Sequence, residues 1–213
     1  MKKKTLTIAI ALVLVVALAV GATWAYLTAT TGPVTNTFTA GKAVASDNLK
    51  LYESKAVQGT DGTYTLGADK VNGNTYTVMP GVNLPKDPTV EVMKADGPYY
   101  LFVEVTKGDQ VGNNDTTKAL SYKVDGTNWT LLEINGKEVY AYTNGGAAAA
   151  IMSAPVTAKV LAGDTITVSG EEALTSALTA ASANLTFKAY ACQAAGFTSA
   201  VEAFNTCFGS TGA

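Results

Sequence analysis

The stretch TNWTLLEINGKEVYAYTN, residues 127–144, decides the fold class of this chain. Two runs rich in β-branched and aromatic residues, Trp129–Ile134 and Glu138–Tyr142, flank the pair Asn135-Gly136. Both residues of that pair accept the positive φ angles of a tight two-residue turn. The stretch therefore predicts an antiparallel β-hairpin.

The same β-rich pattern continues on both sides of the hairpin. Alternating runs of Thr, Val and Tyr are separated by turn signals at short intervals, among them LPKDP at residues 84–88. The sequence predicts an all-β domain, whose many short strands need a sandwich or a barrel to bury their inner faces. The further predicted strands are Leu49–Glu53, Tyr64–Leu66, Thr75–Met79, Thr89–Met93, Tyr99–Thr106, Leu120–Val124, Thr165–Val168 and Leu185–Ala191.

Two short helices are predicted towards the C-terminus. The segment Glu171–Ala183 opens with two acidic residues, which favour a helix N-terminus. In Thr198–Phe208, either Thr198 or Ser199 can act as the N-cap, and apolar side chains share one face. We expect both helices to pack on the outside of the sandwich.

The composition excludes several classes of function. The 213 residues include no histidine, which rules out Ser-His-Asp and Cys-His catalysis and HExxH zinc sites. All 15 basic side chains are lysines, against 17 acidic ones, and the lack of arginine argues against nucleic acid as a partner. The acidic and amide residues of 109–115 do not have the spacing of an EF-hand loop. We expect no enzymatic activity, no cofactor and no metal site.

The N-terminus has the features of a secretory leader. Met1–Lys4 is basic, and Ile8–Val20 is an unbroken run of 13 apolar residues, whereas a membrane-spanning helix needs about 20. Thr23 and Ala25 supply the small residues that a signal peptidase requires, so we predict cleavage between Ala25 and Tyr26. The mature protein is then secreted, into an extracellular matrix or onto the cell surface. An uncleaved anchor is the alternative.

The chain has two cysteines, Cys192 and Cys207. An exported protein can form a disulfide, and a bridge that closes a loop of this size contributes about 3 kcal/mol. Two buried free thiols fit the sequence equally well.

Three stretches carry a resemblance to a known family. GATWAYLTATTGPVTNTFTAGKA, residues 21–43, resembles the start of proteins processed by the signal peptidase SipW, whose leaders end in GxTWA or GxTYA before an NTFTAG-like sequence. VMPGVNLPKDPTVEV, residues 78–92, resembles the family's PG…KDPTV element. FKAYACQAAGFTSAVEAF, residues 187–204, resembles its closing strand and helix. The family includes TasA, CalY and camelysin, secreted bacterial proteins associated with biofilm matrix fibres.

The resemblance implies a jelly-roll-like antiparallel β-sandwich, and fibres in which the mature N-terminal segment of one subunit adds as a strand to the next. The donor segment is then 26–38, and the break Gly32-Pro33 lets the strand leave its own domain. In the alternative arrangement, Val34–Phe38 forms the first strand of its own sandwich. The apolar pegs of the donor are Tyr26, Leu27, Val34 and Phe38.

These expectations divide the chain into a signal peptide (1–25), a donor-strand segment (26–40) and a sandwich domain (41–213). The leading hypothesis is a structural subunit of an extracellular biofilm-matrix or surface fibre, assembled head to tail. Its expected partners are further copies of itself and a signal peptidase of the SipW type, and the sequence leaves an accessory assembly protein open.

Two other functions remain as alternatives. The first is a secreted adhesin or glycan-binding module, whose loops 107–117 and 143–155 would face a ligand. The second is a metalloprotease of the camelysin type. Because the chain has no histidine and two cysteines, a zinc ion would have to be held by carboxylates alone.

Overall fold

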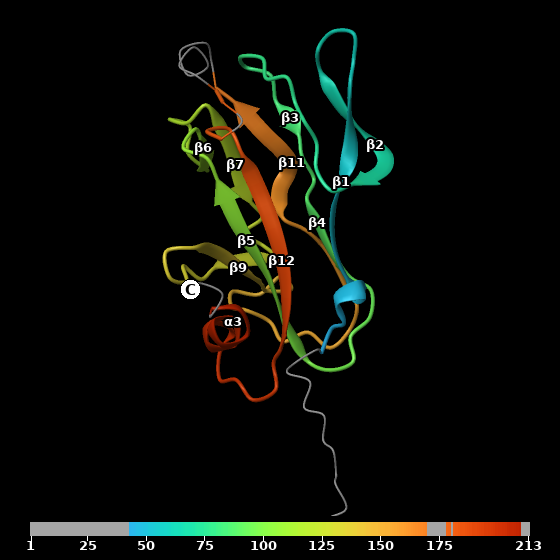
Figure 1. The fold of residues 1–213 in the computed structure, drawn as a ribbon, viewed down its shortest axis with the longest axis vertical. Coiled ribbons are helices and arrows are strands. Elements are labelled where there is room, and N and C mark those ends of the chain that lie inside the picture. The colour runs from blue at the N-terminus through green and yellow to red at the C-terminus, as the bar shows by residue number, and fades with distance from the viewer. Residues whose placement is uncertain (1–42, 170–177, 180, 210–213) are drawn as a thin grey trace, which may run out of the picture. The chain divides into compact units, whose positions relative to one another are not determined.

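The computed structural model describes residues 43–169, 178–179 and 181–209. Within these ranges the protein is an all-β sandwich with one α-helix, which confirms the predicted fold class (Figure 1). The predicted leader, cleavage site and donor segment lie outside the described residues. No helix in the described part of the chain has the length and apolar character to cross a membrane.

The elements follow one another along the chain with short connections. In order they are η1 (Ser46–Asn48), β1 (Leu49–Gln58), β2 (Tyr64–Val71), β3 (Leu84–Pro85), β4 (Thr89–Val92), β5 (Tyr99–Lys107), β6 (Val111–Asn113), β7 (Leu120–Val124), β8 (Trp129–Leu131), β9 (Glu138–Tyr142), β10 (Val156–Lys159), β11 (Leu161–Val168), β12 (Leu185–Gln193) and α3 (Ala200–Phe208).

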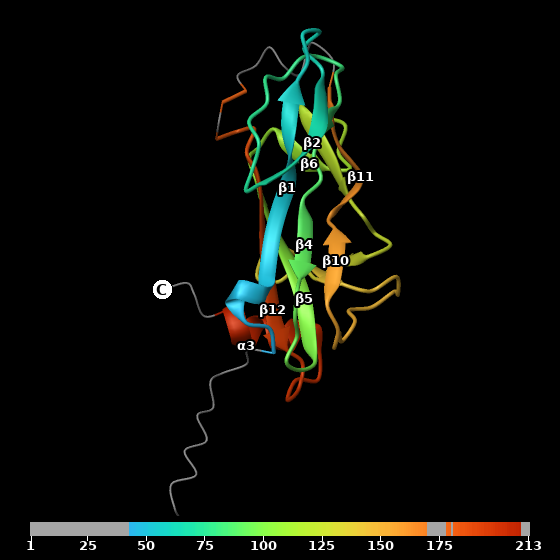
Figure 2. The same cartoon turned by 90° about the vertical axis from the view of Figure 1, so that its right-hand side faces the viewer.

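Two of the three sheets are continuous with each other. Their strand orders are β10-β4-β1-β2 and β3-β11-β7-β6, and Figure 2 shows β1, β4 and β10 side by side. The segment β3–β4 stays antiparallel to β10–β11 from the pair Val92 and Val156 to the pair Leu84 and Ile166. All strand pairs are antiparallel except β6 with β7. The joined sheets form one layer of the sandwich.

The third sheet has the order β12-β5-β9-β8, and its strand β5 is buried on both faces over residues 99–103. Successive side chains of a strand point to opposite faces. On β5, Leu101 and Val103 therefore pack into the main core against the joined sheets, while Tyr100 and Phe102 pack into a second core. This explains why β5 reads as a nearly unbroken apolar run.

Helix α3 covers the second core. Phe204 packs edge-on against Phe102, with 5.2 Å between ring centroids. Ser199 is the N-cap: its hydroxyl accepts from the backbone N–H of Glu202 at 3.2 Å, as the predicted helix required. Cys207 of α3 forms a disulfide with Cys192 of β12. Of the two states that the sequence left open, the structure has the bridge.

The predicted hairpin is confirmed. Asn135 and Gly136 have φ angles of 54° and 75°, and β8 pairs with β9 on either side of the turn. The regular strand β8 ends at Leu131, before the predicted Ile134, and Glu133 also has a positive φ of 43°. The pairing resumes at an isolated bridge between Ile134 and Lys137.

Other predictions were less successful. The predicted strand Thr75–Met79 is wrong, because this segment has no partner strand and is held instead by side chains, as when the Tyr76 hydroxyl donates to the Pro85 carbonyl at 2.5 Å. Strands β3, β6 and β10, of two to four residues, were not predicted. Most of the predicted helix Glu171–Ala183 lies outside the described residues, and its last residues, 181–183, form a turn.

Candidate functional site: an open edge and a buried lysine cluster

Strand β12 has an unpaired side, here termed the open edge. Its only partner in the described part of the sheet is β5. Hydrogen bonds from Gly108 N to the Asn184 carbonyl and from Ala194 N to the Pro98 carbonyl fix the pattern at the two ends of the strand. In an antiparallel pair, hydrogen-bonded and non-bonded positions alternate. The backbone N–H and C=O groups of the odd-numbered residues 185–193 therefore point away from β5.

Strand β1 lies across from the open edge and contacts β12, which runs between β5 and β1 in Figure 1. Residues Leu49–Tyr52 pair with β4, but β2 joins β1 only from Glu53 onwards. Among the described residues, the first half of β1 is therefore also unpaired on one side. Half-buried apolar side chains, such as Leu51 of β1 and Ala189 of β12, line the opening between the two layers.

Three hollows follow the open edge. The one nearest α3, termed the apolar hollow, has a volume of about 560 Å³ and no charged residue in its lining, which includes Leu49, Ala191 and Phe208. A small hollow beside Phe187 comes next. The third, of about 830 Å³, lies beside Leu185 at the far end of β12. The edge thus offers both free main-chain groups and recesses for side chains.

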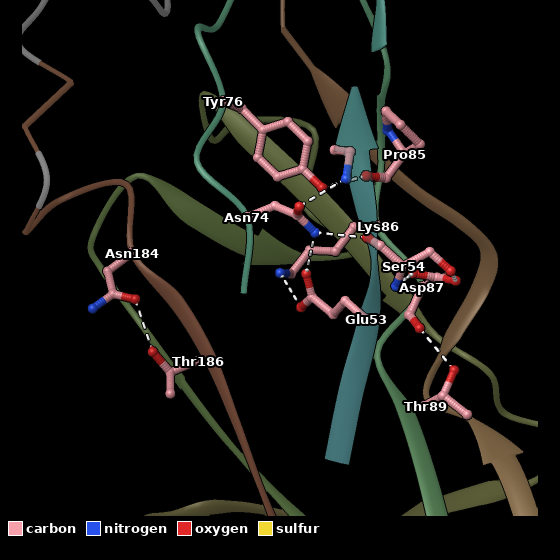
Figure 3. Close-up of polar contacts among 11 residues, drawn as sticks. Glu53, Ser54, Asn74, Tyr76, Pro85, Lys86, Asp87, Thr89, Asn184 and Thr186 are labelled. Atoms are coloured by element: carbon pink, nitrogen blue, oxygen red, sulfur yellow. Dashed lines mark hydrogen bonds and ion pairs between the residues drawn. The ribbon is translucent and has the colours of Figure 1, made fainter. Parts of the chain in front are cut away.

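A buried polar cluster, termed the Lys86 cluster, lies between the second and third hollows. Figure 3 shows the side chains of Lys86 and Asn74, which come from separate segments, converging on the carboxylate of Glu53. The Lys86 ammonium pairs with Oε1 of Glu53, and Asn74 donates from Nδ2 to Oε2 at 3.1 Å. Lys86 and Glu53 are each only 6% exposed. Such a pair needs additional hydrogen bonds to offset the loss of its hydration.

Neighbouring residues hold the Lys86 cluster in place. Asp87 accepts from both the backbone N–H and the hydroxyl of Ser54, at 2.8 and 2.7 Å. The Asn74 side chain accepts from Ala56 N at 2.7 Å and donates to the Ser54 carbonyl at 2.9 Å. Burial, with the nearby carboxylates of Glu53 and Asp87, raises the pKa of Tyr76 well above its usual value. The cluster is therefore a fixed array.

A second cluster, termed the Lys107 cluster, joins β5, β6, β7 and β9. Lys107 pairs with Glu138, and Asn113 donates to the same carboxylate at 3.3 Å. The hydroxyls of Tyr122 and Tyr140 also donate to Glu138, at 2.9 and 2.6 Å. Burial opposes ionisation of Glu138, but the hydrogen bonds from Lys107 and the two tyrosines outweigh it and lower its pKa. Burial and the adjacent Glu138 carboxylate raise the pKa of both tyrosines.

The site residues predicted from the sequence fall into two groups. The disulfide pair Cys192 and Cys207 braces β12 against α3. The described ranges contain no group of three or more His, Cys, Asp or Glu side chains that could hold a metal ion. The predicted cleavage and donor residues Ala25, Tyr26, Leu27, Val34 and Phe38 all lie outside the described residues.

The Lys86 cluster was missed because LPKDP was interpreted only as a turn. One signal was present in the sequence. Alternation along β1 places Glu53 on the same face as Leu49 and Leu51, so a carboxylate was due to point inward. An inward acidic residue implies a buried partner.

Comparison of the chain with protein-family models, with curated proteins and with solved structures gave no match.

Proposed function

We propose that the protein is a secreted structural subunit that assembles head to tail into an extracellular fibre, with segment 26–38 of one copy adding as a strand to the open edge of the next. The leader, with its resemblance to SipW-processed proteins, supports export. The open edge of β12 carries the assembly step, because an unpaired edge is a template for another strand.

The dimensions of donor and acceptor agree. Nine residues of β12 give an edge about 30 Å long. If segment 26–38 adopts an extended strand, Val34 and Phe38, four residues apart, would be about 13 Å apart on one face. Segment 26–38 contains no charged residue. The apolar hollow likewise has no charged residue in its lining, so uncharged pegs would enter it without burying an unpaired charge.

The same segment could instead occupy the edge of its own molecule. Val44, near the start of the described residues, lines the apolar hollow. Self-occupation gives a monomer at every concentration. Donation to the next copy is heterologous and propagates without closing.

Two complementary variants of the mature chain test the assembly. Deletion of residues 26–38 removes the donor and leaves the edge. Ala189→Pro removes an N–H that points away from β5, so it blocks the edge without deleting a hydrogen bond of the sheet. Ala189→Val adds comparable bulk but keeps the N–H, and serves as the matched control.

We expect fibres from the unmodified chain and from Ala189→Val, and none from either test variant alone, as seen by electron microscopy. Mixing the two test variants should give discrete dimers by light scattering, because one can only accept and the other can only donate. Fibres from the deletion variant, with its fold verified by circular dichroism, would overturn the proposal. So would a mixture that stays monomeric while the unmodified chain polymerises.

A further inference from the structure

The Lys86 cluster brings an amine, a carboxamide and a carboxyl group of one chain into contact with one another. Nζ of Lys86 and Nδ2 of Asn74 contact the two oxygens of the same Glu53 carboxylate. The carboxylate thus touches both nitrogen atoms that an amide exchange between the two side chains would involve. Its contacts suit a group that carries protons from one nitrogen to the other.

We infer that Lys86 and Asn74 become joined by an intramolecular amide bond between Nζ and Cγ, with Glu53 as the acid and base of the reaction. The inference concerns the folding of one chain, and it holds whether or not the protein assembles through its open edge.

The step balances without an oxidant, a cofactor or a second reactant. Glu53 accepts a proton from the Lys86 ammonium, and the neutral amine attacks Cγ of Asn74. The new C–N bond forms as the bond from Cγ to Nδ2 breaks. Glu53 carries this proton to Nδ2, and then relays a second proton from the attacking Nζ to Nδ2 in the same way. Nζ keeps the single hydrogen of the amide, and Nδ2 leaves as ammonium with the positive charge that Lys86 loses. The product is a neutral secondary amide beside a Glu53 carboxylate.

The array also contains a group for the charge that develops on the carboxamide oxygen. Oδ1 of Asn74 accepts from the backbone N–H of Ala56 at 2.7 Å. This donor is fixed by the strand β1, so it can stabilise the tetrahedral intermediate without reorganising. The Ser54 carbonyl accepts from Nδ2 and holds the carboxamide in one orientation.

The surroundings favour the reaction. The Lys86 ammonium lies 5.7 Å from the centre of the Phe187 ring, and neither Lys86 nor Glu53 has more than 8% of its side chain exposed. The pair is therefore shielded from bulk water, which would otherwise compete for the protons that pass through Glu53. The larger hollow, lined by both Asn74 and Lys86, opens a path for the departing ammonium.

The bond would fasten an irregular segment of the chain. Residues 72–83 form no strand, and they connect β2 to β3. A link between Asn74 and Lys86 closes this segment into a covalent loop and fixes its start next to the end of β3.

Peptide mapping of the purified mature chain tests the inference. Trypsin cleaves after lysine, but not after a lysine whose Nζ is acylated. We expect a peptide of residues 71–94, lighter by one ammonia than its sequence and without fragment ions from cleavage between Asn74 and Lys86. Complete cleavage after Lys86, with Asn74 at its full mass, would overturn the inference.

Loss of ammonia alone is not sufficient, because an asparagine can also lose it by closing a succinimide on its own backbone. A succinimide leaves Lys86 open to trypsin, and its detection in place of the blocked peptide would count against the inference. Glu53→Gln and Asn74→Ala should each restore cleavage after Lys86 and the full intact mass. Asn72→Ala is the matched control, and it should keep the light, uncleaved peptide.

Discussion

The Lys86 and Lys107 clusters contain the same three residue types in the same contacts, but they lie in different surroundings. In each, a lysine pairs with a glutamate whose carboxylate also accepts from an asparagine. The side chains of the Lys86–Glu53 pair are both 8% exposed, whereas those of Lys107 and Glu138 are 33% and 19% exposed. The first pair is shielded from water and the second is partly solvated.

The two carboxylates also differ in their additional partners. Glu138 accepts from the hydroxyls of Tyr122 and Tyr140, and these hydrogen bonds help to lower its pKa. A carboxylate held in its ionised form is a poor carrier of protons. The residue types alone therefore do not decide between chemistry and structure. Burial and competing donors assign a reactive role to the Lys86 cluster and a structural role to the Lys107 cluster.

The largest effect should follow from Glu53→Ala. This change leaves the Lys86 ammonium buried without its partner and prevents the proposed bond, so we expect the free energy of unfolding to fall by about 3–5 kcal/mol. Urea unfolding followed by fluorescence measures it. Glu91→Ala, which removes only an ion pair with the largely exposed Lys70, is the control and should have little effect. Equal losses in the two variants would contradict the assigned burial.

A smaller loss is expected for the corresponding change in the second cluster, Glu138→Ala. It removes the acceptor of the Tyr122 and Tyr140 hydroxyls, but water can reach part of the site, and we expect a loss of about 2 kcal/mol. The same urea titration gives the value. A loss as large as that of Glu53→Ala would show that exposure does not separate the two clusters.

The sequence predicted the local parts of this molecule better than its long-range contacts. The turn at Asn135-Gly136 and the cap at Ser199 depend on neighbouring residues, and both were predicted. The segment Thr75–Met79 alternates like a strand, but no neighbouring strand pairs with it in the described sheets. Alternation cannot reveal whether a partner exists.

The Lys86 cluster shows the same limit. Glu53 could be placed on an inward face from β1 alone, but Asn74 is 21 residues away and Lys86 is 33 residues away. Their meeting depends on how β1, the segment 72–83 and the connection between β3 and β4 are arranged. No local pattern in the three segments encodes that arrangement.

The pH dependence of the free energy of unfolding should reveal the lowered pKa of Glu138. Its pKa in the folded protein lies below the usual 4.5, so the folded state binds fewer protons than the unfolded state near that pH. The contribution of Glu138 is complete above about pH 4.5 and is lost as the pH falls through the lowered pKa. Glu138→Gln should therefore flatten the loss of stability in acid, as measured by urea midpoints. An unchanged acid slope would show that the tyrosine contacts do not favour the ionised form.

In the Lys107 cluster we expect no amide bond between Lys107 and Asn113, and so no effect on the tryptic digest. Water can solvate the Lys107 ammonium, Glu138 stays ionised, and the side chain of Asn113 is engaged by the Tyr140 hydroxyl at 2.6 Å. Trypsin should therefore cleave fully after Lys107 and release residues 108–118 at full mass, in the same digest that leaves Lys86 uncleaved. A blocked Lys107 would mean that three residue types in contact suffice for the reaction, and that burial is not what selects the Lys86 cluster.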